Sequence, residues 1–172
     1  MELSLQLWHA HLERGETKRS GQLTLIFAIL IWMNTLAPGR SHIDNATAIA
    51  TILLEEPPLF KGDEDRLRTA AFTVAIAFRE SSFRNDVTSK TNDSCMMQIH
   101  SRPDLAEDPV ACMRVAMTML RESMRMCPDH PLAFYVSGPG ACTNARSIRI
   151  SNDRLAIARR LIATQKQKTR EP

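Results

Sequence analysis

The sequence is poor in glycine, in proline and in net charge. It holds 6 glycines and 9 prolines among 172 residues, which excludes a collagen-like or low-complexity chain. The net charge of +3 is too small to indicate a nucleic-acid-binding protein. Only residues 147–150 suggest period-two alternation, so we expect no sheet-based domain. What remains is a chain that is 44% apolar and of a length typical of one domain, two at most.

Charge is distributed unevenly along the chain. Residues 41–108 carry 7 basic and 12 acidic side chains, whereas residues 109–172 carry 11 basic and 4 acidic ones. The basic excess could face an anionic polymer, a membrane surface or water, and the pattern alone does not decide among them.

The longest apolar run lies near the N-terminus. Leu23–Met33 follows Lys18 and Arg19, and no charged residue lies between Arg19 and Arg40. A basic patch before a short apolar run is typical of a secretory signal, and the run is shorter than the roughly 20 residues of a spanning helix. We therefore predict that residues 1–40 are a signal or membrane-anchor segment, with a buried core helix as the alternative. Residues 35–37 and 46–48 have the small side chains of a cleavage site.

This segment predicts a periplasmic or extracellular protein, either released or anchored to the inner membrane through Leu23–Ala37. An even number of cysteines in an exported domain is compatible with two disulfides, and three pairings are open. The Cys127–Cys142 pairing is favoured because these residues flank a stretch rich in proline and glycine. The other two cysteines are Cys95 and Cys112.

The rest of the chain is predicted to be mainly α-helical. A domain over residues 41–163 is followed by a polar tail, residues 164–172. Residues 81–107 show no period and form a predicted loop long enough to be functional. Apolar periodicity predicts helices over about residues 42–56, 65–79, 109–124 and 131–135, and a last one that begins at Ser151 or Asn152.

Glu80 is the candidate general acid. It closes the apolar stretch of the second predicted helix, next to the small side chains of Thr73 and Ala77 on the same face. The negative end of the helix dipole and apolar surroundings both disfavour a carboxylate, so both raise the pKa of this side chain. A raised pKa is what a general acid near neutral pH needs. The alternative is a surface ion pair with Arg79, Arg84 or another cation.

Several short motifs follow Glu80 in a characteristic order. Glu80-Ser81 precedes Ser89, then Met97-Gln98-Ile99, then Ala133-Phe134-Tyr135-Val136-Ser137-Gly138. This set resembles the catalytic domain of lytic transglycosylases of the soluble type (SLT), members of the lysozyme-like superfamily, over residues 63–161. The resemblance implies a goose-type, SLT-like helical domain with a long active-site loop.

The resemblance also implies roles for individual residues. Glu80 matches the catalytic acid and base, and Ser89 a polar residue that contacts the sugar. Met97 matches a groove-lining residue, and Gln98 one that holds the saccharide beside the acid. Tyr135 matches the tyrosine that positions the acid or the sugar.

Two positions depart from the family pattern. Cys95 stands where the family has glycine, so a positive φ there would strain the cysteine unless a disulfide compensates. Val136 stands where the family has asparagine, which removes a polar contact.

By resemblance, the activity is cleavage of the β-1,4 bond between N-acetylmuramic acid and N-acetylglucosamine by one glutamate, with no cofactor. The partners are peptidoglycan glycan strands and, depending on the biological setting, secretion, conjugation or phage machinery. Alternatives are a muramidase that uses Asp86 or Asp93 as a second carboxylate, and a non-catalytic wall-binding or assembly protein. A thiol hydrolase using Cys127 or Cys142 with His130 is a further one. Cys127 and His130 have no second ligand pair, so we expect no metal.

Overall fold

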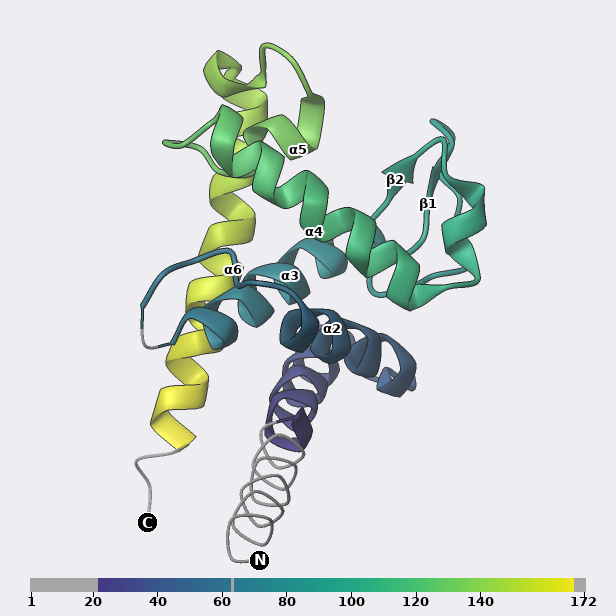
Figure 1. The fold of residues 1–172 in the computed structure, drawn as a ribbon, viewed down its shortest axis with the longest axis vertical. Coiled ribbons are helices and arrows are strands. Elements are labelled where there is room, and N and C mark those ends of the chain that lie inside the picture. Colours follow the sequence, from purple (N-terminus) through teal and green to yellow (C-terminus); the bar gives the residue numbers. More distant parts are fainter. Residues whose placement is uncertain (1–21, 63, 169–172) are drawn as a thin grey trace, which may run out of the picture.

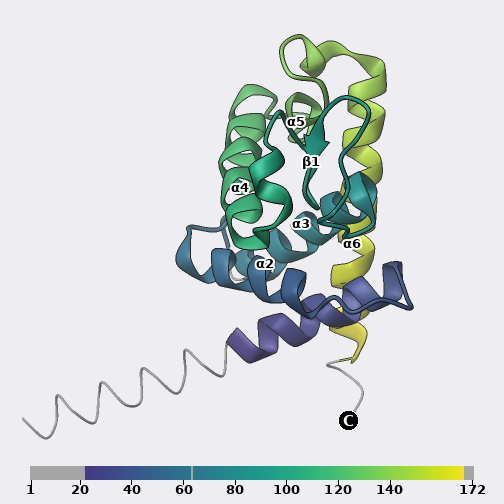
Figure 2. The ribbon, with the colours of Figure 1, turned by 90° about the vertical axis from the view of Figure 1, so that its right-hand side faces the viewer.

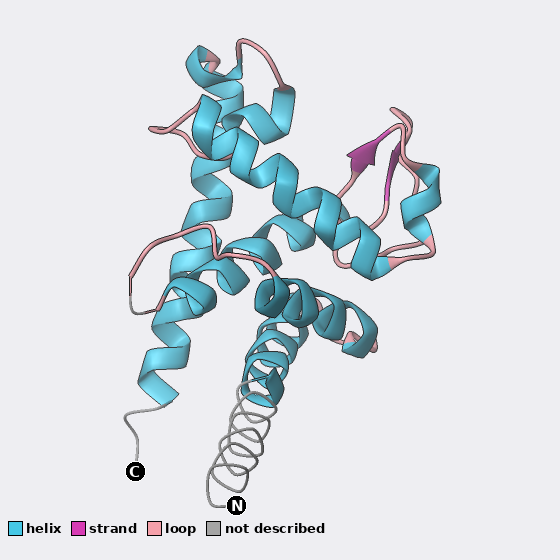
Figure 3. Ribbon diagram, viewed as in Figure 1, coloured by secondary structure: helices cyan, strands magenta, loops and turns pink. Residues whose placement is uncertain are grey.

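The computed structural model describes residues 22–62 and 64–168, and it confirms a mainly α-helical chain (Figures 1 and 3). A single two-stranded antiparallel hairpin interrupts the helices of this part of the chain. The elements after residue 42 are α2 (Ile43–Glu55), α3 (Asp65–Ser81), β1 (Asp93–Ser94), β2 (Ile99–His100), the 3-10 turn η1 (Pro103–Ala106), α4 (Pro109–Met126), α5 (Ala133–Ser137), the 3-10 turn η2 (Ala141–Thr143) and α6 (Ala145–Lys168).

Helix α3 forms the centre of the domain. Every residue from Thr69 to Ala77 is buried, so this helix is enclosed on all sides rather than on one face. The two buried threonines, Thr69 and Thr73, return their hydroxyls to carbonyls one turn earlier, which leaves neither donor unsatisfied. Helix α3 packs against α2 and α6, and Figure 2 shows α4 and α6 flanking α5 and the hairpin. The C-terminal end of α3 therefore lies where these elements meet.

The N-terminal apolar run lies in a helix over residues 22–36 that packs on the core. Ile29, Trp32 and Met33 are buried, as in the core-helix alternative. The opposite face exposes Leu23 and Phe27. None of the helices in the described ranges has the length and apolarity to cross a bilayer. Lys18 and Arg19 lie outside the described residues.

The start of α6 differs from the sequence-based prediction. The predicted caps Ser151 and Asn152 lie inside the helix, and the Asn144 side chain accepts hydrogen bonds from the backbone N–H groups of Arg146 and Ser147 instead. Asparagine is a favoured N-cap residue, and its side chain satisfies donors that the first turn leaves open. The Ser151 hydroxyl is buried and accepts from the Leu132 backbone N–H. The helix continues to Lys168, five residues beyond Ala163.

All four cysteines form disulfides. The favoured Cys127–Cys142 pair is confirmed, and it ties the end of α4 to η2. The second bond joins Cys95 in the hairpin turn to Cys112 in α4. No thiol is left free, so the thiol-hydrolase alternative is wrong, because it lacks its nucleophile.

Candidate active site

Glu80 occupies the penultimate position of α3, where the chain turns out of the helix. Ser82 and Phe83 both have positive φ, at 54° and 64°, and the Ser82 N–H bonds back to the helix. The Glu80 side chain is 18% exposed. The sequence therefore places one carboxylate at the C-terminal end of an apolar helix, where it is partly accessible to solvent.

Arg154 of α6 pairs with Glu80. Its Nη2 donates to Glu80 Oε1 at 2.5 Å, and only 7% of the arginine side chain is exposed. The next residue back on each helix makes a similar but open pair, from Arg79 Nε to Asp153 Oδ2 at 2.7 Å. Consecutive residues of α3 thus pair with consecutive residues of α6, and the two pairs differ mainly in burial.

Burial raises the pKa of Glu80 above that of an ordinary glutamate. The Arg154 charge acts in the opposite direction without cancelling the rise, and the negative charge of Asp93 adds to it. Of the cations in the surface-pair alternative, Arg79 binds Asp153 and Arg84 binds the Ser81 carbonyl. The cation that does pair with Glu80 is Arg154, and this pair is largely buried rather than on the surface.

Asp93 is a second carboxylate near Glu80, and its pKa is shifted in the opposite direction. Burial acts to raise its pKa, but hydrogen bonds from Thr91, Ser89 and His100 outweigh burial and lower it. Thr91 and Ser89 both donate to Oδ2, at 2.5 and 2.7 Å, while His100 Nδ1 lies 3.1 Å from Oδ1 across the hairpin. Two neighbouring carboxyl groups with pKa values shifted apart are typical of acid–base sites.

The turn of the hairpin is anchored directly to the end of α3. Ser81 Oγ donates to the Met96 carbonyl at 2.9 Å, and Asn85 accepts from the Met96 N–H. Gln98 uses its amide nitrogen within the loop, donating to the carbonyls of Cys95 and Val87. Hydrogen bonds between the end of α3 and the hairpin turn therefore fix the positions of Glu80 and Gln98 relative to each other.

Tyr135 comes to the site from the other side, on α5. Its hydroxyl donates to the Met97 carbonyl at 2.7 Å, and its backbone N–H donates to the buried Ser123 hydroxyl of α4. Desolvation, followed by the nearby Glu80 charge, raises the pKa of the phenol, so the hydroxyl stays protonated as a donor. Tyr135 connects α5 to the hairpin across the cleft.

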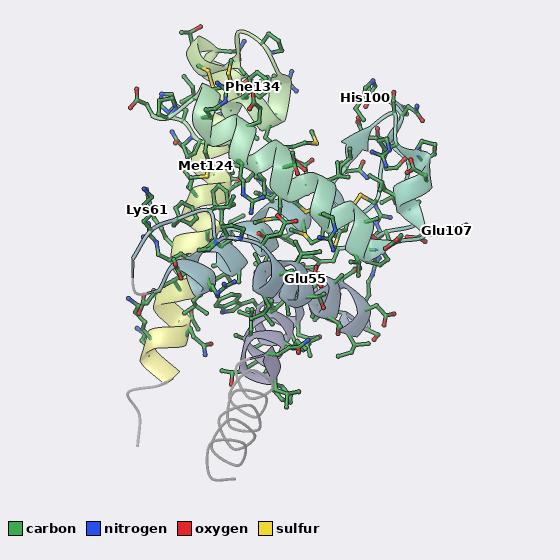
Figure 4. All side chains as sticks on the ribbon, viewed as in Figure 1. Glu55, Lys61, His100, Glu107, Met124 and Phe134 are labelled. Carbon is green, nitrogen blue, oxygen red and sulfur yellow. A yellow bond between two sulfur atoms is a disulfide. The ribbon has the colours of Figure 1, made fainter. Side chains whose placement is uncertain are left out.

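These side chains line one cavity of about 640 Å³, which we call the active-site cleft. The structure brings Glu80, Gln98 and Tyr135 together there, as predicted. The labelled His100 in Figure 4 marks the hairpin side of the cleft. The remaining lining residues are Thr91, Asp93, Met119, Val136, Ser137, Gly138 and Arg154.

Two sequence-based placements need correction, and one of the two candidates for a second carboxylate lies outside the cleft. Met97 is fully buried in the core and does not line the cleft; only its carbonyl takes part, as the acceptor of Tyr135. Ser89 is not among the lining residues either, because its hydroxyl is turned to Asp93 and Thr91. Asp86 is exposed and lies outside the cleft, which leaves Asp93 as the second carboxylate.

Arg154 and His100 are site residues that sequence reasoning missed. Neither belongs to a motif, and Arg154 lies 74 positions from its partner. One signal was available: an arginine on the otherwise apolar inner face of the last helix, next to Leu155 and Ala158. Among the described residues, no group of three or more histidine, cysteine or acidic side chains has a metal-binding arrangement.

A helical domain with a half-buried glutamate at the head of an open cleft is the arrangement expected of a lysozyme-like class of protein. Residues 60–155 match the family model described as "Transglycosylase SLT domain". The chain therefore belongs to the SLT transglycosylase family, whose substrate is peptidoglycan. Comparison with curated proteins and with solved structures gives no match.

Proposed function

We propose that this domain cleaves the β-1,4 bond between N-acetylmuramic acid and N-acetylglucosamine, with Glu80 as the proton donor. The observation that carries the proposal is the raised pKa of Glu80 in a cleft that it shares with Gln98 and Tyr135. Family membership supports the substrate.

In the first step, protonated Glu80 donates its proton to the leaving glycosidic oxygen. The N-acetyl carbonyl of the muramyl sugar stabilises the oxocarbenium-like centre, so no protein nucleophile is needed. In the second step, the Glu80 carboxylate accepts the proton of the C6 hydroxyl, whose oxygen closes a 1,6-anhydro ring. Tyr135 keeps the hairpin turn and α5 at a fixed separation around the sugar.

Arg154 serves the second half of this cycle. Once Glu80 has given up its proton, a buried carboxylate remains, and the guanidinium at 2.5 Å stabilises it until it takes the C6 proton. In the first half the same arginine works against the acid, because it favours the charged form. Burial and Asp93 keep the pKa raised despite Arg154, which lets one residue act as acid and then as base.

Hydrolysis is the second candidate, and Asp93 favours it. This residue lines the cleft, and hydrogen bonds lower its pKa and so keep it ionised, the form that can accept a proton from water. Mass spectrometry of digested peptidoglycan separates the two outcomes: anhydro ends identify transglycosylation and reducing ends identify hydrolysis. In a mixed digest, Asp93→Asn should remove the reducing ends and spare the anhydro ends.

The catalytic role of Glu80 is tested by release of soluble fragments from purified sacculi. Glu80→Gln should abolish release, whereas retained release would refute the role. Since this change leaves Arg154 without a carboxylate, a Glu80→Gln/Arg154→Met variant is measured beside it, and circular dichroism checks that both fold. Binding to sacculi by the wild type with no release would instead indicate a non-catalytic wall-binding protein, the alternative that the departures from the family pattern at Cys95 and Val136 motivate.

We also propose that the domain works outside the cytoplasm, as its substrate requires. Two disulfides support an oxidising compartment. A C-terminal reporter enzyme that is active only after export tests this location in the full chain. Absence of reporter activity, with the fusion present in the cytoplasm, would refute it.

A further inference from the structure

A second, cationic pocket adjoins the active-site cleft. It has a volume of about 480 Å³ and is lined by Arg79, Arg149, Ile150, Asp153 and Arg154. Arg154 also lines the active-site cleft, so the two cavities share a wall. Three arginines accompany one aspartate in this cationic pocket.

The charges of the pocket are only partly compensated. Arg79 is paired with Asp153, and Arg154 with Glu80. Arg149 is exposed and makes no hydrogen bond or ion pair within the described residues. One full positive charge therefore remains available at the mouth of the pocket.

Arg154 adds an independent sign of a missing ligand. The residue is 94% buried, and its Nε and Nη1 atoms have no hydrogen-bond partner in the part of the chain that the structure describes. Buried donors without partners are costly, and a guanidinium cannot relieve that cost by losing its proton. Because Nη2 is bonded to Glu80, each of these two donors requires its own acceptor oxygen, and bonds from a guanidinium to a carboxylate oxygen are strong.

We propose that the cationic pocket binds a carboxylate of the peptidoglycan substrate while the glycan lies in the active-site cleft. The proposal rests on the proposed function, since the carboxylate belongs to that substrate. Two sources share this chemistry: the free lactyl carboxylate of a muramyl sugar without a peptide, and the carboxylates of a peptide stem. Arg149 supplies the exposed contact, and Arg154 connects the bound group to Glu80.

Binding to uncleavable fragments tests the proposal with the intact, full-length protein. The probes are the disaccharide N-acetylglucosaminyl-N-acetylmuramic acid with a peptide stem, the same disaccharide with a free lactyl carboxylate, and chitobiose, which has no carboxylate. None contains the bond proposed for cleavage. Calorimetric titration at low salt should show that the wild type prefers at least one carboxylate-bearing probe over chitobiose.

Arg149→Gln should weaken binding of the preferred probe about fivefold, the upper end for an exposed ion pair, and should leave chitobiose unchanged. Arg149→Lys should recover part of the loss, and salt should reduce the difference between wild type and variant. Arg159→Gln is the matched control, because Arg159 is an exposed arginine of the same helix outside the pocket. It should bind every probe as the wild type does.

The probe that responds to Arg149 identifies the source of the carboxylate. No preference for either carboxylate-bearing probe, no effect of Arg149→Gln, or an equal loss for chitobiose would overturn the proposal. Cleavage of sacculi by the wild type is measured separately. Normal cleavage without carboxylate preference refutes the cationic pocket alone, whereas no cleavage refutes the proposed function.

Discussion

The buried ion pair between Glu80 and Arg154 allows a sharp prediction for stability. Removing one partner of a buried pair leaves an uncompensated charge and typically costs about 3–5 kcal/mol. Glu80 is 18% exposed, so Glu80→Gln should lower the free energy of unfolding by about 3 kcal/mol, the lower end of that range. For a chain of this size the midpoint of thermal unfolding should fall by roughly 6–12 °C.

The two partners should not be equivalent. Arg154→Met leaves a buried carboxyl group that can take up a proton, whereas an arginine left alone stays charged. At pH 7 Arg154→Met should therefore cost less than Glu80→Gln. Because the protonated form of Glu80 needs no partner, the cost of Arg154→Met should shrink further as the pH falls through the raised pKa of Glu80.

Urea denaturation of four variants checks this reasoning. The double variant Glu80→Gln/Arg154→Met should cost less than the sum of the single changes, since neither charge is left buried. Asp153→Asn is the control: it breaks the neighbouring pair, whose side chains are 49% and 43% exposed, and should cost at most about 1 kcal/mol. Additive single changes, or single changes as small as the control, would refute the assignment of a buried, mutually dependent pair.

Three further predictions follow from the same contacts. Wall-cleaving activity should decline as the pH rises through the raised pKa of Glu80, because only the protonated acid donates. A measured pH–rate profile in which activity falls as the pH is lowered from neutrality would contradict this. Breaking the Cys95–Cys112 bond by Cys112→Ala should lower the free energy of unfolding by about 3 kcal/mol. In that background Cys95→Gly should be more stable than Cys95→Ala by about 1 kcal/mol, because Cys95 has a φ of 62°. Equal urea midpoints of these two variants would refute the backbone strain at Cys95. Trp32→Ala should lower the free energy of unfolding by about 3–5 kcal/mol in urea denaturation, whereas Phe27→Ala, at 62% exposure, should stay within about 0.5 kcal/mol; equal effects would show that the N-terminal helix does not pack on the core.

The sequence reveals those features that depend on local pattern. The Asp108 cap of α4 is such a feature, because an aspartate before a proline at the first helical position satisfies open donors within three residues. Cys95, which stands where the family has glycine, has a positive φ of 62° and is bonded to Cys112. The meeting of Glu80, Gln98 and Tyr135 in one cleft could be predicted from the ordered set of motifs, because the order of motifs carries long-range information that periodicity lacks.

Contacts between distant elements could not be predicted from local sequence patterns. Ser89 and Met97 occupy motif positions, but a motif position does not say whether a side chain turns to the ligand, to Asp93 or to the core. The apolar run at residues 23–33 has the same composition whether it enters a membrane or packs on a core. Which of these occurs depends on surfaces that α2 and α3 offer, not on the run itself.

Arg154 connects the acid chemistry to the neighbouring pocket. Glu80 must be protonated before it can donate, and at that moment Arg154 loses the carboxylate that compensates its buried charge. A substrate carboxylate in the cationic pocket would replace that partner from the other side. Glycan carrying such a group would then favour the protonated acid further by competing for Arg154, while glycan without it would leave Arg154 paired with Glu80. Specificity for the carboxylate would thus appear in the rate of the proton-transfer step as well as in binding.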